Sequence, residues 1–513
     1  MVDEKLTLLQ NDSQTSLDGE LSVQFLDLGV VLSVMDSIAL VFGLYDAFMG
    51  EMVSITKKLS NTELNIKDAA PLYGMVLNLG RVYTNVVIFG EASAGLQGSE
   101  VTRTKQLMSI PVTRAGLMGR VIDSLGNPID KKLHPENHKF EFYKRLPIDT
   151  KAEGIIARHP ICEPLQTGLA IVDATTPIGQ GQRELIIGDR KTGKTTIGID
   201  TILAQKNNTV SCIYVAVGQK RSSIAKLVYF LKNKKVLFKT VVISATSSEP
   251  AALQFLAPYT GCTIGEAIAK KGGRSMIIYD DLTKQAVAYR QLCLILRRSP
   301  GREAFPGDVF YLHARLLERA AKFGDRYGFG AFTALPIAET QVGDIAAFVP
   351  TNLISITDGQ IFLETELFNK GIRPAMNVGL SVSRVGSKAQ VDSIKSLSGK
   401  LKLQLAEYRE VQAFSAFASE LDETTQLIIS NGSKLVELLK QPAGRPYSVA
   451  MQVTLLFSGL SGFLETVAIE KIDGFKKNLI DSVASSNLLT EFDIADKRLN
   501  TKAFDAGLRN FVS

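Results

Sequence analysis

A glycine-rich pattern, G-x-x-x-x-G-K-[ST], constrains this chain more than any other feature, and it lies at Gly188–Thr195. The apolar run Glu184–Ile187 precedes it and Thr196–Asp200 reads as a helix start, which is the strand–loop–helix context that a P-loop requires. Backbone N–H groups and the helix N-terminus attract phosphate oxygens there, and Lys194 adds a positive charge. The Thr195 hydroxyl is placed to bind Mg²⁺. The predicted phosphate-binding residues are Gly188, Asp189, Arg190, Lys191, Thr192, Gly193, Lys194, Thr195 and Thr196.

A second nucleotide signal follows downstream at Ser275–Asp281, an apolar strand that ends in two aspartates. A strand ending in Asp is a Walker B pattern, and its carboxylate holds Mg²⁺, mostly through water. We therefore predict that Asp280 lies opposite Thr195 across a bound metal. The simpler alternative is a turn at the end of a strand, because many strands end in aspartate.

Length and composition limit the class of protein. A chain of 513 residues indicates roughly three domains. The net charge of +6 is too mild to indicate nucleic-acid binding, and the strongly apolar windows are interrupted by charges, which excludes an integral membrane protein. The first twenty residues are acidic and lack arginine, so they resemble neither a signal peptide nor a transit peptide. Four scattered cysteines predict reduced, unpaired thiols: Cys162, Cys212, Cys262 and Cys293.

Three successive patterns of apolar and polar residues along the chain predict three domains. Short β-branched runs punctuated by Gly, Asp and Asn fill the region to about residue 95 and predict a small β-barrel. From 96 to 389 apolar strands alternate with helical segments, which is typical of an α/β domain with a buried parallel sheet. From 390 to 513 apolar residues step by three and four, which predicts a helical bundle. The expected domains are therefore 1–95, 96–389 and 390–513.

Five strings of this chain have a highly specific sequence: Gly181–Arg190, Gly218–Ser222, Tyr279–Arg290, Pro300–Asp308 and Pro374–Gly386. They resemble the alpha subunits of F-type ATP synthases. The resemblance implies a β-barrel crown, a RecA-like P-loop core that binds ATP or ADP with Mg²⁺, and a helical C-terminal domain. It also implies a ring of three alpha and three catalytic beta subunits around a central gamma stalk, with a peripheral stalk at the N-terminus. Contact with the membrane is expected only through the whole complex, and no contact with nucleic acid is expected.

One residue distinguishes the alpha from the beta type. The resemblance implies that beta subunits carry a catalytic glutamate where this chain has Gln219, in Gly218-Gln219-Lys220. A neutral amide cannot accept a proton at neutral pH, so Gln219 cannot act as a general base. We expect the site to bind Mg-nucleotide and to hydrolyse it very slowly. The alternative is that Asp281 or Glu339 substitutes for the missing base.

The resemblance assigns a catalytic role to Arg384, in the string Gly379–Arg384. Its counterpart reaches the γ-phosphate bound by the neighbouring beta subunit, as an arginine finger supplied in trans. Ser381 belongs to the same signature and is expected at that interface. Without the resemblance, Arg384 would be interpreted as an ordinary surface ion pair.

The chain departs from the family at the base and at the phosphates. Arg373, Pro374 and Gln441 match positions near the adenine, but Ala443 and Gly444 replace a second glutamine and a tyrosine. Hydrogen-bond specificity for adenine is therefore weakened on one side. A family glutamine inside the P-loop is replaced by Lys191, which either strengthens phosphate binding or points into solvent.

Two other functions compete with the regulatory, non-catalytic alpha subunit of a proton-translocating ATP synthase. A hexameric RecA-like RNA translocase would need a catalytic glutamate and basic and aromatic residues on the barrel, and this chain has Gln219 and a barrel poor in Arg and Lys. A purely structural ring protein would not need Lys194, Thr195 and Asp280. For location, the divergence from the family favours the matrix side of the mitochondrial inner membrane over a bacterial plasma membrane or a plastid thylakoid.

Overall fold

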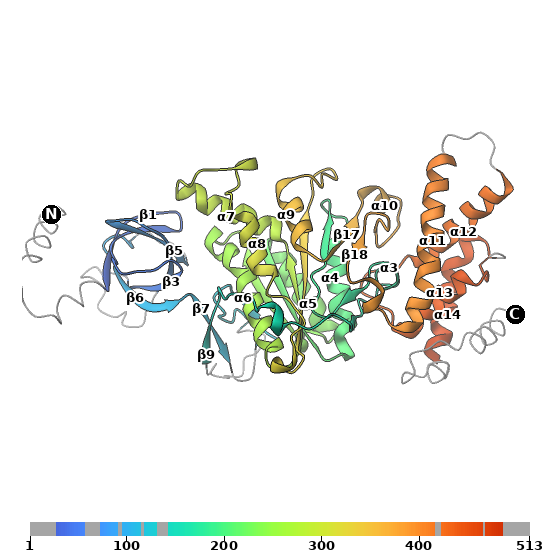
Figure 1. Ribbon diagram of the computed structural model, residues 1–513, viewed down its shortest axis with the longest axis horizontal. Helices are drawn as coiled ribbons and strands as arrows, with labels where there is room; N and C mark the ends of the chain where they lie inside the picture. Colours follow the sequence, from blue (N-terminus) through green and yellow to red (C-terminus); the bar gives the residue numbers. More distant parts are fainter. Residues whose placement is uncertain are drawn as a thin grey trace, which may run out of the picture.

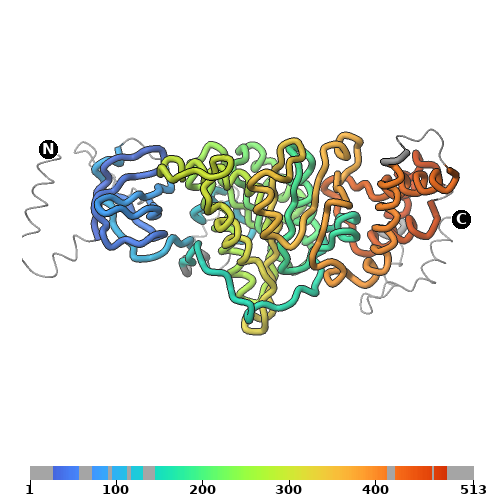
Figure 2. The backbone as a smooth tube through the Cα atoms, turned by 45° about the horizontal axis from the view of Figure 1, so that its top comes forward, coloured from blue at the N-terminus to red at the C-terminus, as the bar shows by residue number. Residues whose placement is uncertain are grey.

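The computed structural model shows three parts in a row: a barrel, an α/β domain and a helical bundle (Figures 1 and 2). It describes residues 27–56, 72–90, 95–113, 117–130, 142–415, 422–464 and 467–485. The expected fold class is therefore confirmed. Within these ranges, no helix is both long and apolar enough to cross a membrane, and the four cysteines are unpaired.

Six antiparallel strands close the N-terminal barrel in the order β1-β2-β5-β4-β3-β6. Alternate residues point inward, so Val31, Val41, Val53 and Val86 are almost completely buried. The strands are β1 (Leu28–Met35), β2 (Ile38–Gly43), β3 (Glu51–Thr56), β4 (Leu72–Leu79), β5 (Tyr83–Phe89) and β6 (Glu100–Leu107). The expected boundary at residue 95 is too early, because β6 lies beyond it and pairs with both β1 and β3.

An eight-stranded sheet forms the centre of the α/β domain, in the order β18-β17-β12-β16-β15-β13-β14-β8. Each neighbouring pair is parallel except β17 with β18. The strands are β8 (Val121–Ile122), β12 (Leu185–Gly188), β13 (Val210–Gln219), β14 (Thr240–Thr246), β15 (Arg274–Asp280), β16 (Ala331–Glu339), β17 (Gly359–Leu363) and β18 (Val382–Ser383). Two small pairs flank it: β7 (Ser109–Thr113) with β9 (Phe142–Pro147), and β10 (Pro164–Leu165) with β11 (Ile178–Gly179).

Helices cover both faces of this sheet. The helices of the domain are α3 (Ala170–Thr175), α4 (Lys194–Ala204), α5 (Arg221–Asn233), α6 (Ala251–Ala269), α7 (Leu282–Ile295), α8 (Val309–Leu317), α9 (Phe348–Ile356) and α10 (Thr365–Asn369). Ile213 and Val215 pack into one apolar core, and their neighbours Cys212 and Tyr214 pack into the other. Because both faces are buried, the strands read as continuous apolar runs.

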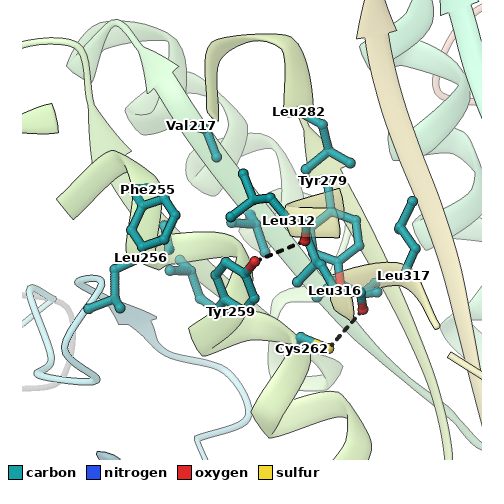
Figure 3. Close-up of a cluster of buried hydrophobic side chains, with 14 of the residues drawn as sticks. Val217, Phe255, Leu256, Tyr259, Cys262, Tyr279, Leu282, Leu312, Leu316 and Leu317 are labelled. Carbon is teal, nitrogen blue, oxygen red and sulfur yellow. Dashed lines mark hydrogen bonds between the residues drawn. The ribbon is translucent and has the colours of Figure 1, made fainter. Parts of the chain in front are cut away.

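The first of these cores packs α6 and α8 against the sheet (Figure 3). Tyr259 of α6 donates a hydrogen bond to the carbonyl of Leu312 at 2.9 Å, and the Cys262 thiol lies 3.5 Å from the carbonyl of Leu316. These bonds satisfy polar atoms that the apolar surroundings would otherwise leave unpaired. The two helices are therefore joined to each other by hydrogen bonds and pack against the sheet from which the phosphate loop emerges.

In the described part of the C-terminal region, four helices form a bundle: α11 (Asp392–Ser415), α12 (Glu423–Leu439), α13 (Val449–Leu460) and α14 (Ile472–Ser485). The predicted apolar stripe is confirmed, since Ile394, Leu401 and Leu405 lie in one buried cluster. Ala170 and Ala174 of α3 belong to the same cluster. The bundle is therefore packed against the α/β domain through α3.

Candidate nucleotide-binding site

The predicted P-loop joins the end of β12 to the start of α4. Gly193 has a φ of +97°, a left-handed conformation that glycine adopts without strain, and an added Cβ there meets no heavy atom within 4 Å. The Lys194 side chain is buried, and its Nζ donates hydrogen bonds to the carbonyls of Gly188, at 2.8 Å, and Asp189. The loop thus encloses one cation and leaves open space beside Gly193, which fits a bound polyphosphate.

Asp189 holds the loop to two neighbouring segments. Its carboxylate accepts hydrogen bonds from the Thr340 hydroxyl at 2.7 Å, the Gly343 N–H at 2.8 Å and the Thr365 hydroxyl at 3.0 Å. Partial burial raises the pKa of Asp189, but these hydrogen bonds outweigh it and lower the pKa below its usual value. Asp189 therefore remains ionised and fixes the loop, rather than taking part in proton transfer.

The two predicted metal ligands meet across the loop. Thr195 Oγ1 donates to Asp280 Oδ2 at 2.7 Å, and the buried Tyr214 hydroxyl donates to the same oxygen at 2.6 Å. Both β12 and β15 are parallel strands of one sheet, so their carboxyl ends reach the same edge. A hydroxyl and a carboxylate in contact beside a phosphate loop fit Mg²⁺, which prefers oxygen ligands. Thr195 and Asp280 would hold the ion, which would neutralise phosphate charge when bound.

Carboxylates around Lys194 keep its charge in place. Burial lowers the pKa of Lys194, and Glu339, Asp281, Asp280 and Asp189 raise it again in part. A buried ammonium forms short, charge-assisted hydrogen bonds with phosphate oxygens. Its place beside the loop therefore fits the diphosphate or triphosphate group of a nucleotide.

Gln219 lies at the end of β13, where its side-chain amide is turned towards Asp280. Its Nε2 is 3.1 Å from the carbonyl of Asp280 and 3.4 Å from the Tyr214 hydroxyl. The amide therefore donates to the backbone at the end of β15 and to a tyrosine hydroxyl. Held this way, Gln219 stabilises the Asp280 turn and offers no base to a water.

The two alternative bases both have partners beside the loop. Burial raises the pKa of Asp281 to about 6, and this side chain caps α7 by accepting from the Lys284 N–H at 2.7 Å. Glu339, at the end of β16, pairs with the exposed Arg190 at 3.5 Å. Neither carboxylate occupies the place of Gln219, which favours a site that binds without fast hydrolysis.

The residues expected at the base lie in two different environments. Arg373 is exposed and its guanidinium stacks on the Phe368 ring at 4.6 Å. Arg373 and Pro374 line a cleft between α10 and helices α11 and α12. Its other lining residues are Ile171, Leu367, Lys370, Ile372, Met376, Val378, Leu405, Tyr408, Arg409, Gln412, Val436, Leu439 and Lys440.

Gln441, in contrast, is buried and bonded to its own chain. Its Nε2 donates to the carbonyls of Gly168 and Arg445, both at 2.8 Å, and its Oε1 accepts from the Ala170 N–H at 3.3 Å. Both amide hydrogens are therefore in use. The contact of Gln441 with a base stays a prediction, and it requires these bonds to break.

Ser381 and Arg384 differ sharply although they are three residues apart. Ser381 is buried; its hydroxyl donates to the carbonyl of Asn377 at 2.6 Å and accepts from the Phe362 N–H at 2.9 Å. It fastens the segment to β17. Arg384 is exposed, and in the part of the chain that the structure describes its guanidinium has no hydrogen bond or ion pair. A free guanidinium at the surface is available to a partner.

Comparison with known protein families gives two matches. Residues 168–383 match the nucleotide-binding domain of the ATP synthase alpha/beta family, and residues 390–512 match the C-terminal domain of its chains. The chain belongs to the ATP synthase alpha/beta family. Members of this family bind nucleotide and assemble, together with other subunits, into a hexameric head. The RNA translocase alternative is not favoured.

Within this family fold, the structure adds site residues that the sequence did not reveal. Tyr214 contacts Asp280, while Thr340 and Thr365 hold Asp189. Tyr214 lies inside an apolar strand and resembles a core residue, so its only sequence signal is a hydroxyl among aliphatic neighbours. The peripheral-stalk contact predicted for the first twenty residues lies outside the described residues.

Proposed function

We propose that this chain is the regulatory, non-catalytic alpha subunit of a proton-translocating ATP synthase head. The observation that carries the proposal is Gln219, whose neutral amide stands where a catalytic base is needed and donates to the backbone carbonyl of Asp280. The chain would bind ATP or ADP with Mg²⁺ through Lys194, Thr195 and Asp280 without fast turnover. ATP synthesis from ADP and phosphate would proceed at the neighbouring beta subunit.

Arg384 supports the second half of the proposal. It is exposed, and its N–H is fixed by the carbonyl of Asp358 at 2.8 Å, so its backbone is held while its side chain is free. A guanidinium supplied in trans stabilises the charge that develops on the transferred phosphoryl group. Arg384 would complete the beta site, with Ser381 holding its segment in place.

The direct test compares the purified chain with the ring reconstituted from this chain and its beta and gamma partners. The chain alone should bind Mg-ATP and release almost no phosphate, while the ring should turn over. The Lys194→Ala chain serves as the matched control for binding. Hydrolysis by the isolated chain at the rate of the ring would overturn the proposal.

The expected partners follow from the same assignment. The loop Pro300–Asp308 is exposed at Gly301–Ala304 and, in this proposal, faces the gamma stalk. The N-terminal region would meet the peripheral stalk, and the complex would sit on the matrix side of the mitochondrial inner membrane. Crosslinks from Arg302 should map to the gamma subunit; crosslinks only to the peripheral stalk would contradict this arrangement.

A further inference from the structure

Gln182 lies at the centre of a buried hydrogen-bond network just before β12. Its side chain is completely buried. Its Nε2 donates to Glu184 Oε2 at 2.7 Å and to Ser383 Oγ at 3.0 Å, and its Oε1 accepts from the Gly179 N–H at 2.8 Å. Ser383 is the residue before Arg384. A fully bonded amide therefore joins the strand that enters the P-loop to the segment that carries the finger.

The Ser383 hydroxyl is held by further bonds. It donates to the carbonyl of Pro177 at 2.8 Å and lies 3.4 Å from the Gly386 N–H. A hydroxyl with one donor hydrogen and two lone pairs is nearly saturated by this set. The turn on both sides of Arg384 is thereby tied to the region around Gln182.

Arg183 holds the same segment through a second set of contacts. Its guanidinium forms a two-point pair with Asp358, with Nε–Oδ2 at 3.0 Å and Nη2–Oδ1 at 2.8 Å. The carbonyl of Asp358 in turn accepts the N–H of Arg384 at 2.8 Å. Gln182 and Arg183 thus both fix the backbone next to Arg384. Gln182 does so through Ser383, and Arg183 does so through Asp358.

Glu184 gives this network an unusual member. Burial, with a smaller effect from Asp358, raises the pKa of Glu184 well above its usual value and so favours the neutral carboxyl. Space around it is tight, since an added Cβ at Gly359 would lie 2.6 Å from Glu184 Oε2. Burying a carboxyl is unfavourable unless it forms hydrogen bonds. Here Glu184 Oε2 accepts a hydrogen bond from Gln182 Nε2 and fixes the direction of that amide.

We propose that Gln182 and Glu184 are positioning residues for Arg384, which set the direction from which its guanidinium reaches the neighbouring active site. This inference rests on the proposed trans role of Arg384. Both residues lie before the P-loop in the chain; Gln182 acts through Ser383, and Glu184 acts through Gln182. A misplacement of a catalytic group by about 1 Å can lower a rate by about 10²-fold. A small shift of the Arg384 guanidinium, caused by loss of this network, should therefore lower the rate at the neighbouring site.

The test uses the reconstituted ring with Gln182→Leu, Ser383→Ala and Glu184→Gln. Gln182→Leu should lower kcat by about 10- to 100-fold. KM, the nucleotide affinity of this chain's own P-loop and ring assembly should stay unchanged. Ser383→Ala removes the same link with little change in volume and should act in the same direction. Glu184→Gln keeps an acceptor oxygen for the Gln182 amide and should retain most of the turnover.

Gln180→Leu is the matched control. Gln180 is also a buried glutamine, two residues upstream, but its Nε2 donates to the carbonyl of Pro164 at 3.1 Å and reaches neither Ser383 nor Glu184. Its loss should leave kcat near the normal value. An equal fall in kcat for Gln180→Leu and Gln182→Leu would show a general packing effect and overturn the inference.

A double variant distinguishes the positioning role of Gln182 from the trans role of Arg384. In an Arg384→Ala ring, adding Gln182→Leu should cause no further loss of residual hydrolysis, because Gln182 acts only through Arg384. If the two losses multiply, the positioning role is wrong and the trans role of Arg384 stands. If Arg384→Ala alone turns over normally, the proposed function fails and the positioning role fails with it.

Discussion

The phosphate site and the Arg384 segment belong to the same sheet, yet they are built in opposite ways. Around the P-loop the polar groups face inward: Lys194 is buried on backbone carbonyls, and Thr195 bonds Asp280. At the sheet edge β18 leads to Arg384, whose backbone is fixed and whose side chain is exposed. The phosphate-binding groups of the first site all come from one chain. In the proposed function, Arg384 is one half of a second site, and another subunit supplies the phosphate.

The strongest test of this contrast is Arg384→Ala. Turnover of the reconstituted ring should fall by roughly 10³-fold or more, because the transition-state charge at the neighbouring site loses its partner. Nucleotide affinity at this chain's own P-loop should not change. Arg384→Lys should rescue poorly, since lysine lacks the planar fork of donors. Steady-state ATPase with ring integrity confirmed measures both, and near-normal turnover in Arg384→Ala would make this arginine structural.

The converse substitution is Lys194→Ala. Affinity for Mg-nucleotide at this chain's P-loop should fall by about 10- to 100-fold, the effect of losing a charge-assisted hydrogen bond. Lys191→Gln is the matched control, because Lys191 is exposed and should change affinity little. Equilibrium binding of a fluorescent ATP analogue gives both values. If Lys191→Gln weakens binding as much as Lys194→Ala does, the loop holds phosphate differently from this description.

The inward-facing site should also show itself in stability. The pKa of Asp281 rises from 3.8 to about 6, chiefly through burial. The folded chain therefore holds this proton more tightly than the unfolded chain does, so the contribution of Asp281 to stability weakens as pH rises through that window. Relative to the wild type, the free energy of unfolding of Asp281→Asn should therefore increase by on the order of 1–3 kcal/mol between pH 4 and pH 6.

Thermal unfolding at several pH values measures this gain. Arg384→Ala is the control on the other side of the comparison, because its exposed side chain should add nothing to the pH dependence. A constant difference between Asp281→Asn and the wild type from pH 4 to pH 7 would show that Asp281 is not the group that titrates.

The smallest expected effect belongs to Gln219→Glu. A carboxylate there supplies a base, but the site still lacks an arginine from the opposite neighbour, so hydrolysis by this chain should stay slow. Single-turnover phosphate release from the isolated chain is the measurement. Rapid release would mean that the inward-facing site lacked only its base.

Much of the nucleotide site could be predicted from the sequence because its signals are local. Gly188–Thr195 is continuous, and Asp280 ends a parallel strand, so both had to reach the same edge of the sheet. The strand β6 (Glu100–Leu107) was missed as part of the barrel, since its mostly polar, exposed residues carry little of the apolar alternation of the other strands. Pairing with β1 and β3 makes it a strand.

Contacts over long sequence distances could not be predicted in this way. Gln182 and Ser383 are 201 residues apart, and they meet only because β17 pairs with both β12 and β18. The direction of the Gln441 amide was equally hidden, because it depends on carbonyls of Gly168 and Arg445. A residue type shows which bonds are possible, and only the fold shows which are made.

The attachment of the helical bundle has a mechanical consequence. Gly168 accepts from both Gln441 and the Tyr447 N–H, the Gly444 N–H is 2.7 Å from Asp200 Oδ1 in α4, and α3 lies in the core of the bundle. These contacts connect the bundle to α4, the helix that follows the P-loop, and to α3. A displacement of the bundle would therefore be passed to the start of the phosphate-binding helix rather than absorbed between the two domains.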